Sequence, residues 1–250
     1  MPCAARIPSR YGSGDRVALF LPCYIDVFSP HIGQALIELF ARLGVRIDYP
    51  VDQTCCGQPA FNAGYWPQTR AVAAHFARTF AHYPWIVVPS CSCAAMVRSC
   101  YRQVGAGDDA IEVSERVYDL ATFLVDVLGV VDVGARFPHR VTYHDGCHGR
   151  RELLTGDRAV RLLQAVAGLE YVGLPAIDEC CGFGGLFSVK YAELAGSMAD
   201  AKRASVLETG AAVLTSGDAS CLMHVAGSLS RDARTRHVRC MHLTEILVRV

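Results

Sequence analysis

The feature that most constrains this chain is a pattern of cysteines that occurs twice. The tripeptide Cys-Cys-Gly stands at Cys55–Gly57 and again, 125 residues later, at Cys180–Gly182. The closing segments 117–127 and 240–250 also resemble each other, so the chain consists of two similar halves. One further cysteine precedes each pair and another follows it; they are Cys23 and Cys93 in the first half and Cys147 and Cys221 in the second.

Each half alternates short apolar runs with amphipathic segments, which predicts alternating strands and helices. Alternation of this kind is typical of parallel sheets covered by helices. The predicted fold class is therefore α/β, with two pseudo-repeated halves, each a small, mainly parallel sheet flanked by helices. The predicted strands are 17–21, 45–50, 85–89, 140–144, 169–175 and 211–216, and the predicted helices are 31–44, 66–83, 158–168 and 190–210.

The link between the halves is expected near 129–138. This stretch is not of low complexity, so we expect the halves to pack together rather than to be tethered. The chain then divides into a loose N-terminal segment (1–15), a first repeat (16–130) and a second repeat (131–250).

The composition argues against several classes of protein. Basic and acidic residues balance at 24 each, which gives no basic surface for nucleic acid. No apolar run reaches the roughly 18 to 20 residues that span a bilayer, and the N-terminus lacks the apolar core of a signal peptide. We therefore expect a soluble cytoplasmic protein. In such a reducing compartment, its 12 cysteines indicate metal or redox chemistry more often than disulfides.

Every recurring cysteine follows the C-terminal end of a predicted strand. In a parallel sheet these loops meet at one edge, where open α/β folds bind their ligands. The sequence therefore predicts two sites of four thiols. The first is made by Cys23, Cys55, Cys56 and Cys93, and the second by Cys147, Cys180, Cys181 and Cys221.

Four cysteines are the usual complement of a [4Fe–4S] cluster. Structural zinc sites draw on short Cys-x(2–4)-Cys knuckles, and this chain has none at corresponding places. Glycine after each pair suits a tight turn beside a bulky ligand and leaves amides free to donate to sulfur. A zinc site, or a dithiol–disulfide couple without metal, remains an open alternative. The candidate cofactor-binding glycines are Gly57, Gly182, Gly184 and Gly185.

The remaining cysteines are interpreted more simply. Cys3 in the N-terminal segment and Cys240 in a predicted strand are bystanders, and Cys100 is expected on the flank of a helix. Cys91 stands two residues before Cys93 and is either a spare ligand or a redox partner.

His144 and His148 flank Cys147, and we expect them mainly to order that loop, with hydrogen bonding to a cluster sulfur or proton transfer as alternatives. His224 follows Cys221 by three residues and is within reach of the same site. The histidines expected in solvent on predicted helices are His31, His75 and His82, and the basic residues near the cysteine loops are Arg98, Arg150, Arg151 and Lys190.

Four phrases carry a resemblance to known proteins: CCGQPAFNAG, CCGFGGLFSVK, YHDGCH and SGDASCL. The doubled pattern is similar to the cysteine-rich CCG domains of heterodisulfide reductase and of the iron–sulfur component of glycolate oxidase. Because no ferredoxin domain accompanies it, the chain most resembles the lactate utilisation protein A family. The resemblance spans nearly the whole chain, and it maps the cluster cysteines of the family onto the eight cysteines of the two predicted sites.

This resemblance implies an iron–sulfur electron-transfer subunit of a complex that oxidises L-lactate to pyruvate. The chain would then be an oxidoreductase subunit, active only with a ferredoxin-like iron–sulfur subunit and a third lactate-utilisation subunit. The full CCG pattern ends in Cys-x-x-Cys, but here the last positions are Met96 and His224. That departure favours ordinary [4Fe–4S] clusters, one per half, over disulfide-splitting chemistry. The alternatives are a related subunit acting on another small molecule, such as glycolate or a disulfide, and a zinc or thiol redox scaffold.

Overall fold

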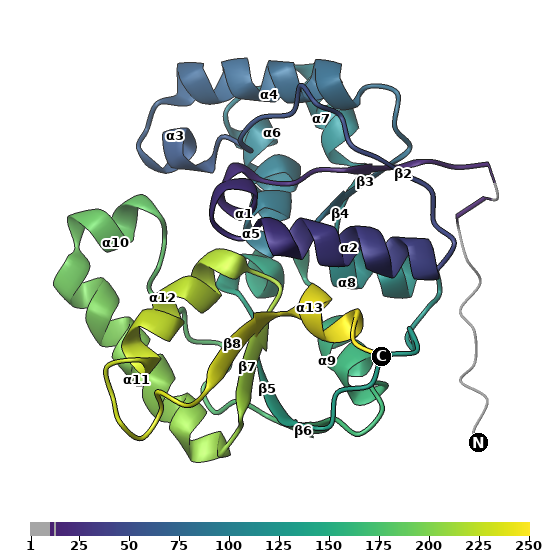
Figure 1. Ribbon diagram of the computed structural model, residues 1–250. Helices are drawn as coiled ribbons and strands as arrows, with labels where there is room; N and C mark the ends of the chain where they lie inside the picture. The colour runs from purple at the N-terminus through teal and green to yellow at the C-terminus, as the bar shows by residue number, and fades with distance from the viewer. Residues whose placement is uncertain (1–10, 13) are drawn as a thin grey trace.

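The structure is a computed structural model that describes residues 11–12 and 14–250 (Figure 1). Cys3 and most of the predicted loose segment lie outside the described residues. Two four-stranded sheets have the same strand order, β2-β1-β3-β4 and β6-β5-β7-β8, and every pairing is parallel. The predicted α/β class with two pseudo-repeated halves is confirmed. The strands are β1 (Val17–Leu19), β2 (Ile47–Asp48), β3 (Trp85–Val88), β4 (Val117–Asp119), β5 (Arg140–His144), β6 (Glu170–Val172), β7 (Val213–Ser216) and β8 (Arg239–His242).

Helices cover both faces of each sheet (Figure 1). Those of the first half are α1 (Cys23–Phe28), α2 (Pro30–Arg42), α3 (Gln58–Asn62), α4 (Trp66–Phe80), α5 (Cys91–Ala95), α6 (Tyr101–Gln103), α7 (Asp108–Ser114) and α8 (Leu120–Thr122), with π-helical turns η1 (Met96–Cys100) and η2 (Phe123–Val127). Those of the second half are η3 (Gly149–Leu153), α9 (Arg158–Gln164), α10 (Leu186–Lys190), α11 (Ala192–Thr209), α12 (Ala219–Leu229) and α13 (Leu243–Leu247).

The predicted elements are present but mostly shorter than the patterns indicate. β2 has two residues where the apolar pattern predicted a strand over 45–50. The helix predicted over 190–210 is α11 (Ala192–Thr209); a separate short helix, α10, ends just before it, because Tyr191 leaves the helical region with φ −128° and ψ 54°. The strand predicted around Cys240 is β8, and its counterpart in the first half, β4, is a strand that the sequence patterns did not predict.

The strand order determines where a ligand site can form. From the central strand β1 the chain crosses to β2 on one side, and later to β3 on the other. The carboxyl ends of β1 and β3 therefore flank a topological switch point, the usual ligand site of open α/β sheets. Cys23 and Cys93 follow these two strand ends, and Cys147 and Cys221 follow the equivalent β5 and β7.

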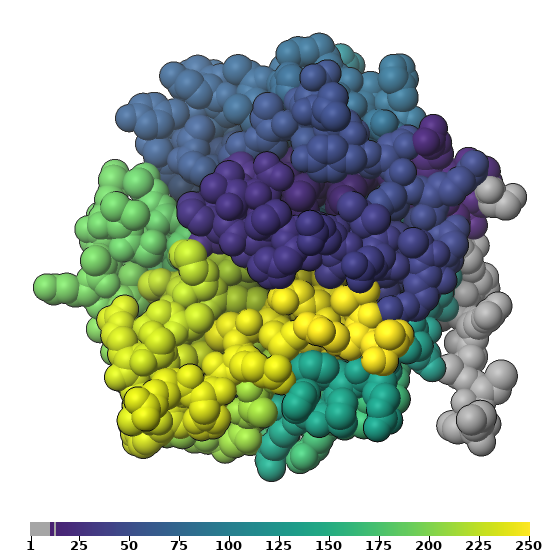
Figure 2. All heavy atoms as spheres, viewed as in Figure 1, coloured from purple at the N-terminus to yellow at the C-terminus, as the bar shows by residue number. Residues whose placement is uncertain are grey.

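One apolar core extends across both halves. Phe40 of α2 and Phe123 of η2 are fully buried in it together with Val141 of β5, Leu162 of α9 and Ile246 of α13. The space-filling view shows the C-terminal segment lying directly against α2 of the first half (Figure 2). The halves are therefore packed together, as predicted.

A buried carboxylate joins the equivalent loops of the two halves. Oδ1 of Asp218, just after β7, accepts hydrogen bonds from Ser90 Oγ (3.0 Å), the Ser92 amide (3.0 Å) and Ser92 Oγ (2.8 Å), just after β3. A Cβ on Gly146 would lie 2.6 Å from the other oxygen, Asp218 Oδ2. Asp218 is 1% exposed. Water therefore cannot replace its carboxylate as the hydrogen-bond acceptor of these donors.

We expect Asp218→Ala to lower the free energy of unfolding by about 2 kcal/mol or more, because three donors, among them the buried Ser90 hydroxyl, lose their acceptor. Asp218→Asn retains an oxygen acceptor and should lose less. Thermal unfolding of the two variants measures the difference. The matched control is Asp132→Ala, which removes an exposed carboxylate bonded only locally to Gly134. Equal melting temperatures for Asp218→Ala and the control would contradict this role.

Candidate metal centres

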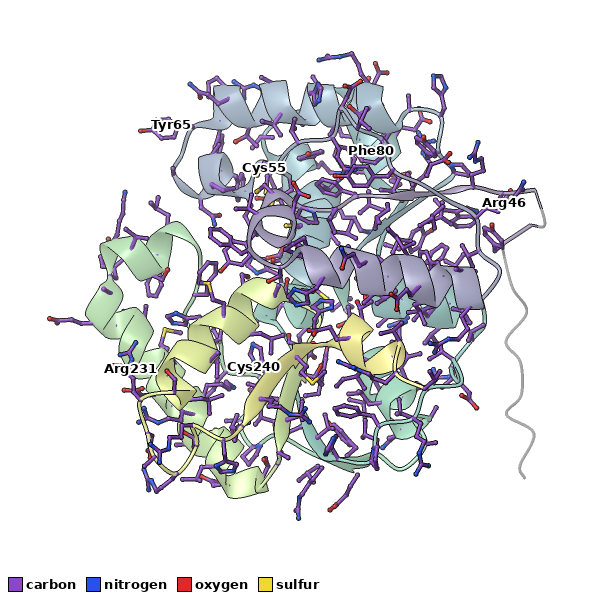
Figure 3. The ribbon with its side chains drawn as sticks, in the orientation of Figure 1. Arg46, Cys55, Tyr65, Phe80, Arg231 and Cys240 are labelled. Carbon is purple, nitrogen blue, oxygen red and sulfur yellow. The ribbon has the colours of Figure 1, made fainter. Side chains whose placement is uncertain are left out.

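The first thiol site, defined as Cys23, Cys55, Cys56 and Cys93, comes from three loops at one sheet edge. Cys23 is the first residue of α1, the Cys-Cys pair lies between β2 and α3, and Cys93 lies in α5. The Ser90 hydroxyl accepts a hydrogen bond from the Cys93 amide at 3.3 Å, which fixes the start of α5. Figure 3 shows Cys55 close to α1.

Its four sulfurs form a continuous chain of contacts. Cys23 contacts Cys55, Cys55 contacts Cys56, and Cys56 contacts Cys93. Hydrogen bonding from Cys23, and then from Cys56, holds the pKa of Cys55 well below the ordinary thiol range. The same interactions raise the pKa values of Cys23 and Cys56. One thiolate thus accepts hydrogen bonds from two neighbouring thiols.

The second thiol site, defined as Cys147, Cys180, Cys181 and Cys221, repeats this order of contacts. The sulfurs of Cys147 and Cys180 are 3.8 Å apart, and Cys181 interacts with both Cys180 and Cys221. Hydrogen bonding from Cys147, and then from Cys181, lowers the pKa of Cys180 to about 2. Both predicted sets of four cysteines therefore converge.

Sulfurs in such contact cannot all ionise without a compensating positive charge, because like charges repel at short range. Thiolate is the form that binds metal, and a metal core supplies the missing charge. A cavity of about 140 Å³ is bounded by all four cysteines of the first site. It exceeds the space that one ion or one water molecule needs. The donor set and the space fit a polynuclear, thiolate-bound metal group.

The glycine after each pair takes the left-handed conformation and turns its amide back toward sulfur. Gly57 (φ +88°) donates to Cys55 Sγ at 3.4 Å, and Gly182 (φ +87°) donates to Cys180 Sγ at 3.3 Å. Gly184 (φ +50°) and Gly185 (φ +59°) continue this turn in the second half. Such amides stabilise negative charge on sulfur. A role of these four glycines in cofactor binding stays a prediction.

The two sites are neighbours. The ring of Tyr24, next to Cys23, packs edge-on against Phe183, with 5.8 Å between the ring centres. Phe183 and Leu186 of the second half also line the cavity of the first site. The edges that carry the two thiol sites therefore face each other.

The three histidines near the second thiol site differ in their contacts. Neither ring nitrogen of His144 has a hydrogen-bond partner among the described residues, so a role in ordering its loop stays a prediction. Its ring nitrogen, Cys181 Sγ and Cys221 Sγ all lie within 4.8 Å of one another. His148 Nδ1 lies 3.6 Å from Cys147 Sγ. His224 instead turns to the Ala195 carbonyl oxygen, 3.1 Å away.

Cys91 is buried and belongs to the contact between the halves. A Cβ on Gly217 would lie 3.0 Å from its sulfur, and one on Gly149 3.4 Å, so the thiol faces the second half. Cys100 ends η1 and is buried in the apolar core of the first half. Cys240 lies on β8 in the other half from Cys55 (Figure 3).

The arginines near the loops contact protein groups rather than standing free. Arg98 donates to the carbonyls of Glu115 and Val117, and Arg151 donates to that of Asp178. Arg150 lies 3.6 Å from Asp145. His31 and His82 are exposed as predicted and so is Lys190, whereas His75 is half-buried and bonds the Asp52 carbonyl.

Lys202 is a residue that the sequence patterns did not single out. It lies on α11, its side chain is fully buried, and its Nζ donates to the Ala176 carbonyl at 2.7 Å. Burial lowers its pKa, and the neighbouring Glu179 and Cys181 act in the opposite direction. No sequence signal marks such a lysine, because lysines are almost always exposed.

Comparison with known proteins places this arrangement in a family. The cysteine-rich domain CCG matches residues 17–98 and again residues 141–226. The chain belongs to the lactate utilization protein A family of CCG-domain proteins. Lactate utilization protein A of Anoxybacillus flavithermus is 43% identical over 92% of this chain and 98% of its own length. That of Geobacillus sp. (strain WCH70) is 42% identical over 93% and 98%.

Among solved structures, glutamate racemase isoform RacE1 of Bacillus anthracis covers 95% of this chain and 80% of its own, with a TM-score of 0.37 and 10% identity. A likeness at this level carries no conclusion about the CCG chain. No helix in the described part of the chain is long and apolar enough to cross a membrane.

Gly182 gives a test of the second thiol site. In Gly182→Ala the new Cβ would meet Met198 Cβ at 2.7 Å and the Ala195 carbonyl oxygen at 2.8 Å. We expect a clear fall in melting temperature and weakened metal uptake, because the Cys-Cys turn must move. Gly210→Ala is the control, since it shares the left-handed backbone but has open space around its Cβ. Equal effects in the two variants would mean that backbone strain alone explains the change.

Proposed function

We propose that each thiol site binds one [4Fe–4S] cluster and that the chain is the iron–sulfur electron-transfer subunit of an assembly oxidising L-lactate to pyruvate. The observation that carries this proposal is the convergence of four sulfurs at each of two facing sheet edges. Four thiolates are the usual ligand set of such a cluster, and when bound it supplies reversible one-electron chemistry. The names of the relatives support lactate as the substrate of the assembly.

A cluster accounts for the geometry better than zinc does. Adjacent cysteines such as Cys55 and Cys56 reach different metals of a polynuclear group without the distortion that one tetrahedral ion requires. The cavity beside the first site is also larger than one ion needs. The Gly57 and Gly182 amides, which donate to sulfur, would tune the reduction potential of the bound group.

Electron transfer accounts for the presence of two thiol sites in one chain. Oxidation of lactate to pyruvate releases two electrons and two protons, and two one-electron centres in one chain match the number of electrons. Of the eight cysteines in the two thiol sites, seven are buried or half-buried and Cys23 is exposed, which leaves little sulfur open to a small molecule. We therefore place the oxidation of lactate in the assembly and assign electron relay to this chain. Its partners are a ferredoxin-like iron–sulfur subunit and a third lactate-utilisation subunit.

Exposed apolar side chains support contact with such partners. Elements that line the cavity of the first site, or directly follow them, carry Phe28 (66% exposed), Tyr65 (61%), Val189 (77%) and Met223 (48%). Exposed apolar side chains on neighbouring elements are the kind of surface that protein–protein contacts use.

Removal of single sulfurs tests the cluster proposal. After anaerobic purification we expect about eight irons and about eight acid-labile sulfides per chain, four of each for each cluster. Cys56→Ser and Cys181→Ser should each lose about half of both. Cys240→Ser is the matched control, because this thiol lies on β8, outside both thiol sites, and should retain them all. Full iron in Cys181→Ser, or zinc in place of iron, would overturn the proposal.

The assignment to electron relay has its own test. The cluster-loaded chain alone should oxidise L-lactate very slowly, and addition of the two partner subunits should restore turnover measured as pyruvate formed. Rapid turnover by the lone chain would contradict the assignment of relay to this subunit.

A further inference from the structure

The internal repeat allows the surroundings of the two thiol sites to be compared position by position. Phe20 stands three residues before Cys23, and His144 stands three residues before Cys147, at equivalent ends of β1 and β5. On the covering helices, Val72 lies against Gly57 and Met198 lies against Gly182. The next residue one helical turn later is Phe76 on α4 and Lys202 on α11. The pair Phe20–Phe76 therefore corresponds to the pair His144–Lys202.

The first thiol site rests on an apolar layer. Phe20 and Phe76 pack edge to face with ring centres 5.1 Å apart, and Phe20 also contacts Phe80 at 5.6 Å. All three rings are buried, and they share one apolar cluster with Cys56 and Cys93. These aromatic rings bring neither charge nor a strong hydrogen-bond donor close to the sulfurs.

At the second thiol site the same two positions are polar. His144 is 1% exposed, both its ring nitrogens lack hydrogen-bond partners among the described residues, and it lies beside the sulfurs of Cys181 and Cys221. A buried imidazole without a partner is costly unless a further group accepts its hydrogen bond. The structure thus holds an unsatisfied donor aimed at this site.

Lys202 brings a cationic side chain to the same place. Its Nζ donates a hydrogen bond to the carbonyl oxygen of Ala176, a non-glycine residue held at φ +49°. The ionisable groups that face it are Asp178, Glu179, Cys180, Cys181 and His144. A fully buried ammonium group needs negative charge close by; Glu179 provides the largest favourable interaction, followed by Cys181, Asp178 and Cys180.

We propose that His144 and Lys202 give the centre in the second thiol site a higher reduction potential than the centre in the first. When the chain carries a single electron, that electron then resides on the second centre. This inference rests on the proposed function, since it requires a cluster at each site. It assigns His144 and Lys202 as positioning residues for charge, acting on the bound group and its thiolates.

The direction follows from electrostatics. Reduction adds one negative charge to a group that four thiolates already make negative. A nearby ammonium group and an N–H donor to sulfur stabilise the added charge, whereas aromatic surroundings do not. Between the centres, one electron leaves the first and one arrives at the second, with no proton or bond change. The electrons come from lactate oxidised in the assembly, and a partner iron–sulfur subunit accepts them.

A redox titration followed by electron paramagnetic resonance tests this on the cluster-loaded full chain, with dithionite as reductant. We expect two one-electron transitions at different potentials. Lys202→Met and His144→Phe, the latter installing the residue of the first half, should each lower the higher transition and leave the lower one unmoved. The expected shift changes the electron distribution between the centres at least tenfold, which is about 59 mV for a one-electron couple.

Lys190→Met is the matched control, because it removes the same charge from the exposed end of α10. Coincident transitions in the wild type would overturn the inference. So would variants at His144 and Lys202 that shift the lower transition, or that shift nothing beyond the control. If Lys202→Met fails to fold, His144→Phe decides alone. A chain without iron and sulfide overturns the proposed function itself, whereas a loaded chain with equal potentials overturns only this inference.

Discussion

The parallel pairing of β1 with both β2 and β3, repeated by β5 with β6 and β7, determines where the sulfurs lie. Cysteines some thirty residues apart in the chain meet because parallel strands end at the same edge of a sheet. The adjacent pair in each half follows the outermost of these strands and needs a left-handed glycine to turn its sulfurs inward. No single segment could gather four thiols in this way without a much tighter, knuckle-like loop.

The second constraint is charge. Four thiols in mutual contact are stable as thiolates only around a positive core, and the groups beneath them decide how well further negative charge is tolerated. Both halves place four cysteines in the same arrangement, but the side chains that lie next to the cysteines differ. Aromatic rings lie beneath the first site, and His144 and Lys202 lie beneath the second. Duplication thus gives two equal sets of four cysteines, and the few residues that differ give the two sites unequal surroundings.

Much of this could be predicted from the sequence. The constant offset between repeated cysteines and the apolar runs before them were enough to predict two α/β halves and both sets of four sulfurs. What could not be predicted depends on how the halves meet. Cys91 lies two residues before Cys93 in the sequence, yet its thiol faces Gly149 and Gly217 of the other half. No periodicity within one half reports a contact between halves.

The buried polar residues were harder still to predict. A lysine in a helix is expected on the solvent face. The sequence therefore did not predict that Lys202 is buried, on the side of α11 that faces the second thiol site. His144 was hard to predict for a related reason. Its place at the end of the predicted strand 140–144 was correct, but the sequence did not show that its side chain points into the protein, beside the sulfurs of Cys181 and Cys221.

The central claim is that the first and second thiol sites each hold a separate polynuclear iron centre. Anomalous diffraction at the iron edge, from crystals grown without oxygen, tests it most directly. The account predicts two compact iron peaks per chain, one bounded by Cys23, Cys55, Cys56 and Cys93 and the other by Cys147, Cys180, Cys181 and Cys221. A single iron peak, a signal at the zinc edge, or iron bound outside these eight sulfurs would contradict it.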